Sequence, residues 1–287
     1  MVDLHTHSVL SDGSYKVEEL IEEAKQRGVT ALAVTDHDDL RSVDYIKKHH
    51  LATDIIMLPG IEMSTETHYL GSKTKIHLLG YGFDNNDPQL NLTLNELYKR
   101  RRQDNWNFIK ELINRYSFLD EKSFETLDCS KYGWIKKLIL MHLKDAITKE
   151  QYYELASYLD KNKPVYHNYN TGVEEAIRLI HNAGGYAIIA HPYRTYLEEE
   201  QLDNLIRYLV TKHGLDGLET HHSEASTKDM KIATYLAEKY HLMKTTGSDF
   251  HHHDEYNIEI GTGINNNIIT EELPLVKKLV KENKNIK

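Results

Sequence analysis

Short apolar runs alternate with amphipathic segments along most of the 287-residue chain. Residues 2–7 form the first apolar run, residues 14–27 have apolar positions at helical spacing, and residues 31–35 form a second run. An apolar run without polar alternation is typical of a strand that is covered on both faces. The alternation therefore predicts an α/β fold in which parallel strands are covered by helices.

The same reading extends to the rest of the chain. Thr171 and Glu174 have the spacing of a capping box, which predicts a helix that begins there and ends at Gly184-Gly185. Further strands are predicted at residues 55–61, 75–81, 186–190, 215–220 and 241–246, and further helices at residues 202–213, 227–240 and 271–282.

The alternation lapses between residues 84 and 169, where helices are predicted at residues 90–116, 134–146 and 149–159. Such a long stretch without a convincing strand fits poorly into a strand–helix repeat. We therefore predict a barrel domain of residues 1–83 and 170–287 with a helical inserted cap of residues 84–169. The alternative is that this stretch contains further barrel elements with strands that the pattern does not reveal.

Composition excludes several classes of protein. The net charge is −9 with neutral histidines, which argues against broad non-specific binding to duplex nucleic acid. No apolar run is long enough to span a bilayer, and the single cysteine, Cys129, excludes a disulfide framework. These features predict a cytoplasmic enzyme without a membrane partner.

Metal-binding side chains follow the predicted strands at their C-terminal ends. In a barrel of parallel strands these ends converge on one face, where active sites are built from several strands. A single histidine in such a position carries little weight, but several in phase predict a site. The segments are His5-Thr6-His7, Thr35-Asp36-His37-Asp38, Gly60-Ile61-Glu62, Ala190-His191-Pro192, Glu219-Thr220-His221 and Ser248-Asp249-Phe250-His251.

The local spacing supports metal binding. His5 and His7 are two residues apart in a strand, so their side chains share a face and could hold one ion. Asp249 and His251 repeat this spacing, although the backbone there could already be turning. Imidazole with carboxylate suits Zn, Mn or Fe, and Asp3 is a candidate to orient the His5 ring.

Together these segments resemble the PHP (polymerase and histidinol phosphatase) family, in particular the stand-alone phosphoesterases that act on nucleotides. The resemblance covers nearly the whole chain and implies a distorted (β/α)7 barrel with a cofactor of two to three divalent metal ions (Mn, Fe or Zn). It rests on His5-Thr6-His7-Ser8, Ser11-Asp12-Gly13, Thr35-Asp36-His37-Asp38, Gly60-Ile61-Glu62, Ala190-His191-Pro192 and Gly247-Ser248-Asp249-Phe250-His251.

The resemblance also implies which residues hold the metals. The strand pattern alone does not select His77, which enters only through the resemblance and would otherwise be an ordinary strand histidine. Carried over by motif, the first metal is held by His5, His7, Glu62 and Asp249, the second by Glu62, His77 and His191, and the third by Asp12, His37 and His251.

The sequence departs from the family in the insertion. Nucleotide-acting members commonly have a Gly-Arg-Pro-His segment there, whereas this chain reads Tyr132-Gly133-Trp134-Ile135-Lys136-Lys137. Near the last motif, Thr245-Thr246 precede it and His252-His253 follow it. The first departure leaves the identity of the substrate open, and neither touches an expected ligand.

Other residues are candidates for binding the substrate or donating a proton. Arg194 lies three residues beyond His191, and Arg101 and Arg102 belong to a basic run that is otherwise the solvated face of a helix. His222, and beside it His221, are candidates for the general acid, or else solvated turn residues.

We therefore predict a hydrolase that cleaves a phosphomonoester of a small metabolite by means of a metal-activated hydroxide. The resemblance favours a nucleotide such as AMP or a 3′,5′-bisphosphate. Alternatives are a 5′-3′ exonuclease on short single-stranded RNA or DNA, a histidinol-phosphate phosphatase, and a non-catalytic metal-binding module. The sequence does not give the oligomeric state.

Overall fold

The computed structural model describes residues 1–130, 135–162, 170–252, 257–269 and 273–286. The chain divides into two compact units, one formed by Met1–Leu92 with Asn170–Lys287 and the other by Thr93–Tyr169. The domain boundaries predicted from the sequence, 1–83 with 170–287 and 84–169, stay a prediction.

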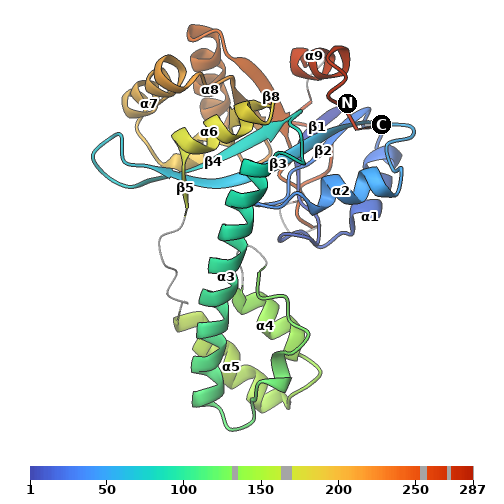
Figure 1. Cartoon of the computed structure of the whole chain (residues 1–287), viewed down its shortest axis with the longest axis vertical. Coiled ribbons are helices and arrows are strands. Elements are labelled where there is room, and N and C mark those ends of the chain that lie inside the picture. Colours follow the sequence, from blue (N-terminus) through green and yellow to red (C-terminus); the bar gives the residue numbers. More distant parts are fainter. Residues whose placement is uncertain (131–134, 163–169, 253–256, 270–272, 287) are drawn as a thin grey trace. The chain divides into compact units, whose positions relative to one another are not determined.

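The first unit is built on a barrel-shaped sheet with the strand order β1-β2-β3-β4-β6-β7-β8 (Figure 1). The barrel is nearly closed between its first and last strands: the His7 amide donates to the Phe250 carbonyl at 2.9 Å, and the Asp249 amide donates to the His5 carbonyl at 2.8 Å. The predicted α/β barrel is therefore confirmed. The strands are β1 (Val2–Thr6), β2 (Ala31–Val34), β3 (Ile56–Thr67), β4 (Thr74–Tyr81), β6 (Tyr186–Ile189), β7 (Gly217–His222) and β8 (Met243–Gly247), and the short β5 (Thr171–Gly172) pairs with β3.

One strand differs from the predicted parallel arrangement. β4 runs antiparallel to both β3 and β6. Only residues 68–73 connect β3 to β4, whereas a parallel crossover needs a dozen residues or more. β3 is also longer than predicted, so Glu62 lies within a strand and pairs with Leu79 instead of following the end of a strand.

Helices cover the sheet between successive strands. Their apolar positions recur at helical spacing and are buried, as in α6, where Val173, Ala176, Ile177 and Ile180 are each fully buried. The helices of this unit are α1 (Val17–Gln26), α2 (Arg41–Lys48), α6 (Val173–Asn182), η2 (Pro192–Thr195), α7 (Glu199–His213), α8 (Thr227–Lys239) and α9 (Pro274–Lys281).

The predicted start of α6 is wrong. Its N-cap is Gly172, without a side-chain cap, and Thr171 belongs to β5. The Glu174 carboxylate accepts a hydrogen bond from the Thr67 hydroxyl at 2.7 Å instead of closing a capping box. The local spacing was compatible with a cap, but strand pairing with β3 takes precedence.

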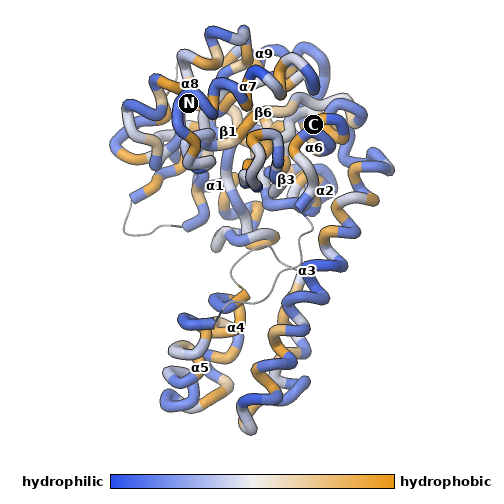
Figure 2. The backbone as a smooth tube through the Cα atoms, turned by 90° about the vertical axis from the view of Figure 1, so that its left-hand side faces the viewer, coloured by the Kyte–Doolittle hydropathy of each residue, from blue (hydrophilic) through white to orange (hydrophobic). Residues whose placement is uncertain are grey.

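The second unit has its own hydrophobic core. α3 (Pro88–Arg115) carries the chain into it, followed by η1 (Lys122–Phe124), α4 (Ile135–Leu143) and α5 (Lys149–Lys161). Hydrophobic and hydrophilic residues alternate along these helices (Figure 2), and the apolar ones form a cluster that includes Ile109, Leu112 and Leu155. The helices predicted here are present, although Trp134, the predicted first residue of one of them, lies outside the described residues.

Among the described residues, no helix combines the length and the apolar character required to cross a membrane. This agrees with the expectation from the sequence that no span is present. The cytoplasmic location stays a prediction.

Closure of the barrel leaves no room for a side chain at Gly247. A Cβ atom there would lie 2.2 Å from the Cβ of His5 and 2.9 Å from a carboxylate oxygen of Glu219. We expect Gly247→Ala to lower the free energy of unfolding by about 1–3 kcal/mol or more, measured by urea denaturation. The control is Gly172→Ala, whose new Cβ would meet only the flexible Glu174 carboxylate at 3.4 Å and should cost about 1 kcal/mol or less. Equal stability of Gly247→Ala and wild type would contradict this packing.

The single thiol reports on the second unit. Cys129 is buried, and this burial raises the pKa of its thiol, so less of it is thiolate at any mildly alkaline pH. We expect iodoacetamide to label Cys129 much more slowly in the native protein than in guanidinium, as followed by mass spectrometry. Equal rates in the two states would show that this core is not formed.

Candidate metal centre

The Glu62 carboxylate lies at the centre of a group of imidazoles. Glu62 is fully buried on β3, beyond the last residue that pairs with β2. Its Oε1 atom lies 2.8 Å from His77 Nδ1 and 3.0 Å from His191 Nε2. Its Oε2 atom lies within 3.2 Å of three further imidazole nitrogens, at His5 Nε2, His7 Nε2 and His37 Nδ1.

A second carboxylate, that of Asp249, faces the same group after the end of β8. Its Oδ1 atom lies 3.3 Å from His5 Nε2 and 3.1 Å from His7 Nε2. Its Oδ2 atom points the other way, accepting from Arg194 at 2.9 Å and lying 3.2 Å from His222 Nε2. Asp249 has a φ of +55°, in the left-handed region, so the chain has already left the strand here.

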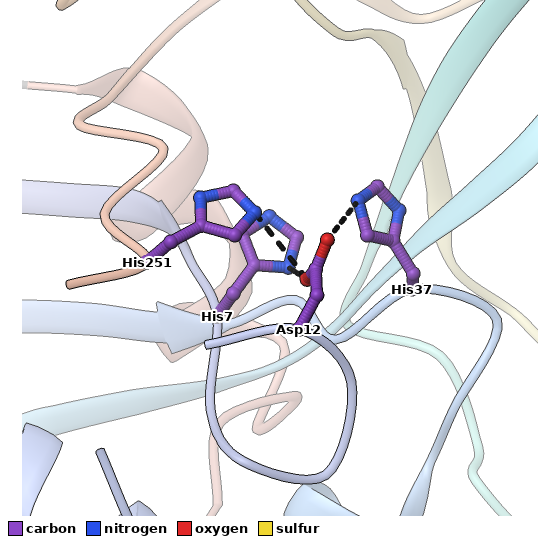
Figure 3. A group of neighbouring side chains, drawn as sticks. All are labelled: His7, Asp12, His37 and His251. Carbon is purple, nitrogen blue, oxygen red and sulfur yellow. Dashed lines mark ion pairs between the residues drawn. The ribbon is translucent and has the colours of Figure 1, made fainter. Parts of the chain in front are cut away.

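The third carboxylate, that of Asp12, stands between histidines from three segments (Figure 3). Its Oδ2 atom lies 3.7 Å from His37 Nε2, and its Oδ1 atom lies 3.3 Å from His251 Nε2 and 3.7 Å from His7 Nδ1. His7 thus faces Asp12 with one ring nitrogen and Glu62 and Asp249 with the other.

The structure brings together all nine residues that the sequence suggested as metal ligands. Among the described residues, several groups offer ligand atoms that lie within 4.8 Å of one another. Three of these groups are made of the predicted residues: His5, His7, Glu62 and Asp249; His7, Asp12, His37 and His251; and His37, Glu62 and His77.

Unsatisfied buried atoms show that the residues fit a cation. His5 Nε2, both ring nitrogens of His7, Asp12 Oδ1 and Glu62 Oε2 are buried and have no hydrogen-bond partner among the described residues. Buried polar atoms are almost always hydrogen-bonded, so such a concentration needs an explanation. A divalent ion that accepts these lone pairs would supply it, and the mixed nitrogen and oxygen set suits Zn, Mn or Fe.

The electrostatics of the group favour positive charge. Burial alone lowers the pKa of His7, but the hydrogen-bonded carboxylates of Asp249 and Glu62 outweigh it and raise the pKa to about 10. Burial opposes ionisation of Glu62, but the surrounding histidines hold its pKa well below the usual range. The carboxylates that would keep a proton on His7 would equally attract a metal cation.

Two other histidines are neutral. Burial is the largest cause that lowers the pKa of His37 to about 3 and that of His191 to about 4. A neutral imidazole keeps a lone pair, which is the form that a metal requires.

The His5 ring is held by a residue that sequence analysis did not select. Glu219 Oε1 lies 3.0 Å from His5 Nδ1, and Glu219 is buried. The signal was present, because Glu219 lies near the end of a predicted strand, but a lone glutamate between apolar residues did not stand out. Asp3, which was expected to orient the His5 ring, instead accepts from the backbone amides of His5, Ser248 and Gly261.

Arg194 and His222 both reach the centre through Asp249. The Arg194 guanidinium also donates to Glu224. His222 is buried, and its Nδ1 atom accepts the Glu224 amide at 3.1 Å, with the Tyr193 hydroxyl at the same distance. His221, the other proton-donor candidate, is partly exposed and its Nδ1 lies 3.0 Å from the Thr220 hydroxyl.

The remaining predicted residues belong elsewhere. Arg101 and Arg102 lie in the second unit, where Arg101 is buried and donates to the Ser130 carbonyl at 3.4 Å, while Arg102 is exposed. Their contact with a substrate stays a prediction. Residues 132–134 and His253 lie outside the described residues.

Comparison with known proteins now decides the family. Residues 3–284 match the family described as PHP domain. The chain belongs to the PHP domain family. The resemblance seen in the sequence is therefore confirmed, and it covers nearly the whole chain.

Three curated relatives act on phosphate esters, according to their names. A phosphoribosyl 1,2-cyclic phosphate 1,2-diphosphodiesterase of Eggerthella lenta is 30% identical, over 87% of this chain and 93% of its own. The 5'-3' exoribonuclease Rnm of Salmonella typhimurium is also 30% identical, over 87% and 84%. A 3',5'-nucleoside bisphosphate phosphatase of Chromobacterium violaceum is 27% identical, over 95% and 92%. The predicted class, a phosphoric ester hydrolase, agrees with all three.

The central position of Glu62 gives a direct prediction. Glu62→Gln removes the charge that five imidazoles face, so we expect the purified protein to retain much less divalent metal, measured by plasma mass spectrometry after manganese loading and desalting. Glu66→Gln is the matched control, because Glu66 lies on the same strand, is buried and pairs with Lys73 at 2.6 Å. Full metal content in Glu62→Gln would contradict the proposed centre.

Proposed function

We propose that this PHP-family protein is a metal-dependent phosphoesterase that hydrolyses a phosphomonoester of a small metabolite, with a nucleotide as the substrate class. The observation that carries the proposal is the buried Glu62 carboxylate surrounded by five imidazole nitrogens within 3.2 Å. Such a group has little purpose without a cation, and divalent cations in PHP-type barrels suit the activities named for the relatives.

We further propose the ligands of two to three Mn, Fe or Zn ions. Glu62 is shared between the first two positions, since its two oxygens face different histidines. The first position is held by His5, His7, Glu62 and Asp249, the second by Glu62, His77 and His191, and the third by Asp12, His37 and His251. When bound, such ions activate water for attack and neutralise charge on the phosphoryl oxygens.

Arg194 is the candidate to bind the phosphoryl group. Its guanidinium has five N–H donors, and only its contacts with Asp249 and Glu224 are accounted for. The side chain is 36% exposed, so a substrate can reach it, while Asp249 holds it beside the centre. This is the placement needed to bind a phosphate in two-point fashion.

His222 has a position that favours orienting Asp249. A backbone amide donates to its Nδ1, so in the neutral ring Nε2 carries the proton and donates to Asp249 Oδ2. Its role as general acid stays a prediction, because that same proton is already directed at a carboxylate.

A second candidate function is a 5′-3′ exonuclease on short RNA or DNA, favoured by the 30% identity to an exoribonuclease. The nucleotide reading is supported by the nucleoside bisphosphate phosphatase, which covers 95% of this chain. Histidinol phosphate and a non-catalytic module remain as alternatives for the assay.

The activity test is phosphate release from a panel of esters by the manganese-loaded protein. The panel holds AMP, a 3′,5′-bisphosphate nucleotide, a 5′-phosphorylated oligoribonucleotide and histidinol phosphate. We expect preference for a mononucleotide, and loss of that activity in His5→Ala and Asp249→Ala with an unchanged circular dichroism spectrum. Release only from the oligonucleotide or histidinol phosphate would replace the substrate, and no release despite bound metal would favour the non-catalytic module.

Arg194 has its own test. We expect Arg194→Ala to lower kcat/KM by roughly 10- to 100-fold, since a hydrogen bond to a charged group is worth about 1.5–3 kcal/mol. Arg178→Ala is the control, because Arg178 is also a surface arginine paired with a glutamate, Glu175. An unchanged kcat/KM in Arg194→Ala would remove Arg194 from the substrate site.

A further inference from the structure

Glu219 connects two parts of the metal centre that come from different strands. It lies on β7, is 2% exposed, and uses both carboxylate oxygens. Oε1 lies 3.0 Å from the Nδ1 atom of His5 on β1, and Oε2 accepts the backbone amide of His191, after β6, at 2.7 Å. One buried charge therefore reaches two histidines that we assign to different metal positions.

The contact with His5 determines which ring nitrogen is available. A carboxylate only accepts, so His5 Nδ1 must donate its proton to Glu219. The Nε2 atom then carries the lone pair, and it points to Glu62 Oε2 at 3.2 Å and Asp249 Oδ1 at 3.3 Å. Glu219 thus selects the tautomer of His5 that can bind a cation between these two carboxylates.

The contact with His191 holds an unfavourable backbone conformation. His191 has φ +25° and ψ +65°, in the positive-φ region that residues other than glycine rarely adopt. Such a residue costs of order 1–3 kcal/mol and persists only where its surroundings impose it. The short hydrogen bond to Glu219 Oε2 supplies such a restraint, and the imidazole is thereby directed to Glu62 Oε1 at 3.0 Å.

We propose that Glu219 is a positioning residue that sets the geometry of two metal positions at once, through the His5 ring and the His191 backbone. The proposal rests on the proposed metal-dependent function. It requires a carboxylate, because a glutamine in its place has one acceptor oxygen and cannot accept from both groups.

Glu219 is not itself proposed as a ligand, although His5, Glu219 and His222 offer atoms within 4.8 Å of one another. The His5 Nδ1 to Glu219 distance is that of a hydrogen bond, and a cation between them would need both lone pairs. His222 already directs one nitrogen at Asp249 and accepts the Glu224 amide on the other.

The test is manganese affinity of the full chain, titrated with Mn²⁺ alone while free ion is followed by electron paramagnetic resonance. Glu219→Gln is compared with Asp216→Asn as a matched control. Asp216 Oδ2 also binds a histidine ring, His181 at 2.7 Å, and a backbone amide, that of Ala187 at 2.8 Å. It precedes β7, at the opposite end from Glu219's partners, so it makes the same kind of contacts outside the centre.

We expect Glu219→Gln to weaken manganese binding by about 10- to 100-fold while Asp216→Asn binds as wild type. The melting temperature of the metal-free proteins separates positioning from stability, because a purely structural role would lower it without changing affinity. Glu219→Asp, which keeps the charge but is one methylene shorter, should weaken binding less and serves if the glutamine variant does not fold. Wild-type affinity in both Glu219 variants would overturn the proposal, whereas absence of manganese from the wild type would overturn the proposed function instead.

Discussion

The structure depends on the burial of one negative charge. Glu62 is fully buried, and a buried carboxylate is costly unless it is compensated by positive charge and hydrogen bonds. Five imidazoles provide this compensation, and they come from segments that are far apart in the sequence. Only a barrel that closes β1 against the segment after β8 can bring His5 and His7 between Glu62 and Asp249.

The centre is also held by a polar shell that fixes backbone segments. Asp36, the residue before His37, accepts hydrogen bonds from the Ser8 amide and hydroxyl and from the Ser11 hydroxyl, at 2.6–2.8 Å. These bonds fix the loop that carries Asp12. Asp3 similarly joins the His5 amide to Ser248 and Gly261, which secures the barrel closure. The positive φ angles of His191 and Asp249 are in keeping with this restraint, since strained residues cluster at functional sites.

Much of this could be predicted from the sequence, because repeated patterns have physical causes. The alternation of apolar runs and amphipathic helices predicted the barrel, and the histidines and acids after the strands predicted a common site. Other features depend on pairing that no local pattern encodes. β4 is antiparallel because its connection to β3 is short, which is why the strand pattern did not select His77. Glu219 was missed because its partners, His5 and the His191 amide, are distant in sequence.

Anomalous X-ray diffraction from crystals of the manganese-loaded protein tests the central claim most directly. The account predicts an anomalous peak within bonding distance of Glu62, His5, His7 and Asp249, and a second beside Glu62 on the side of His77 and His191. Manganese peaks elsewhere on the protein, with none beside Glu62, would contradict it.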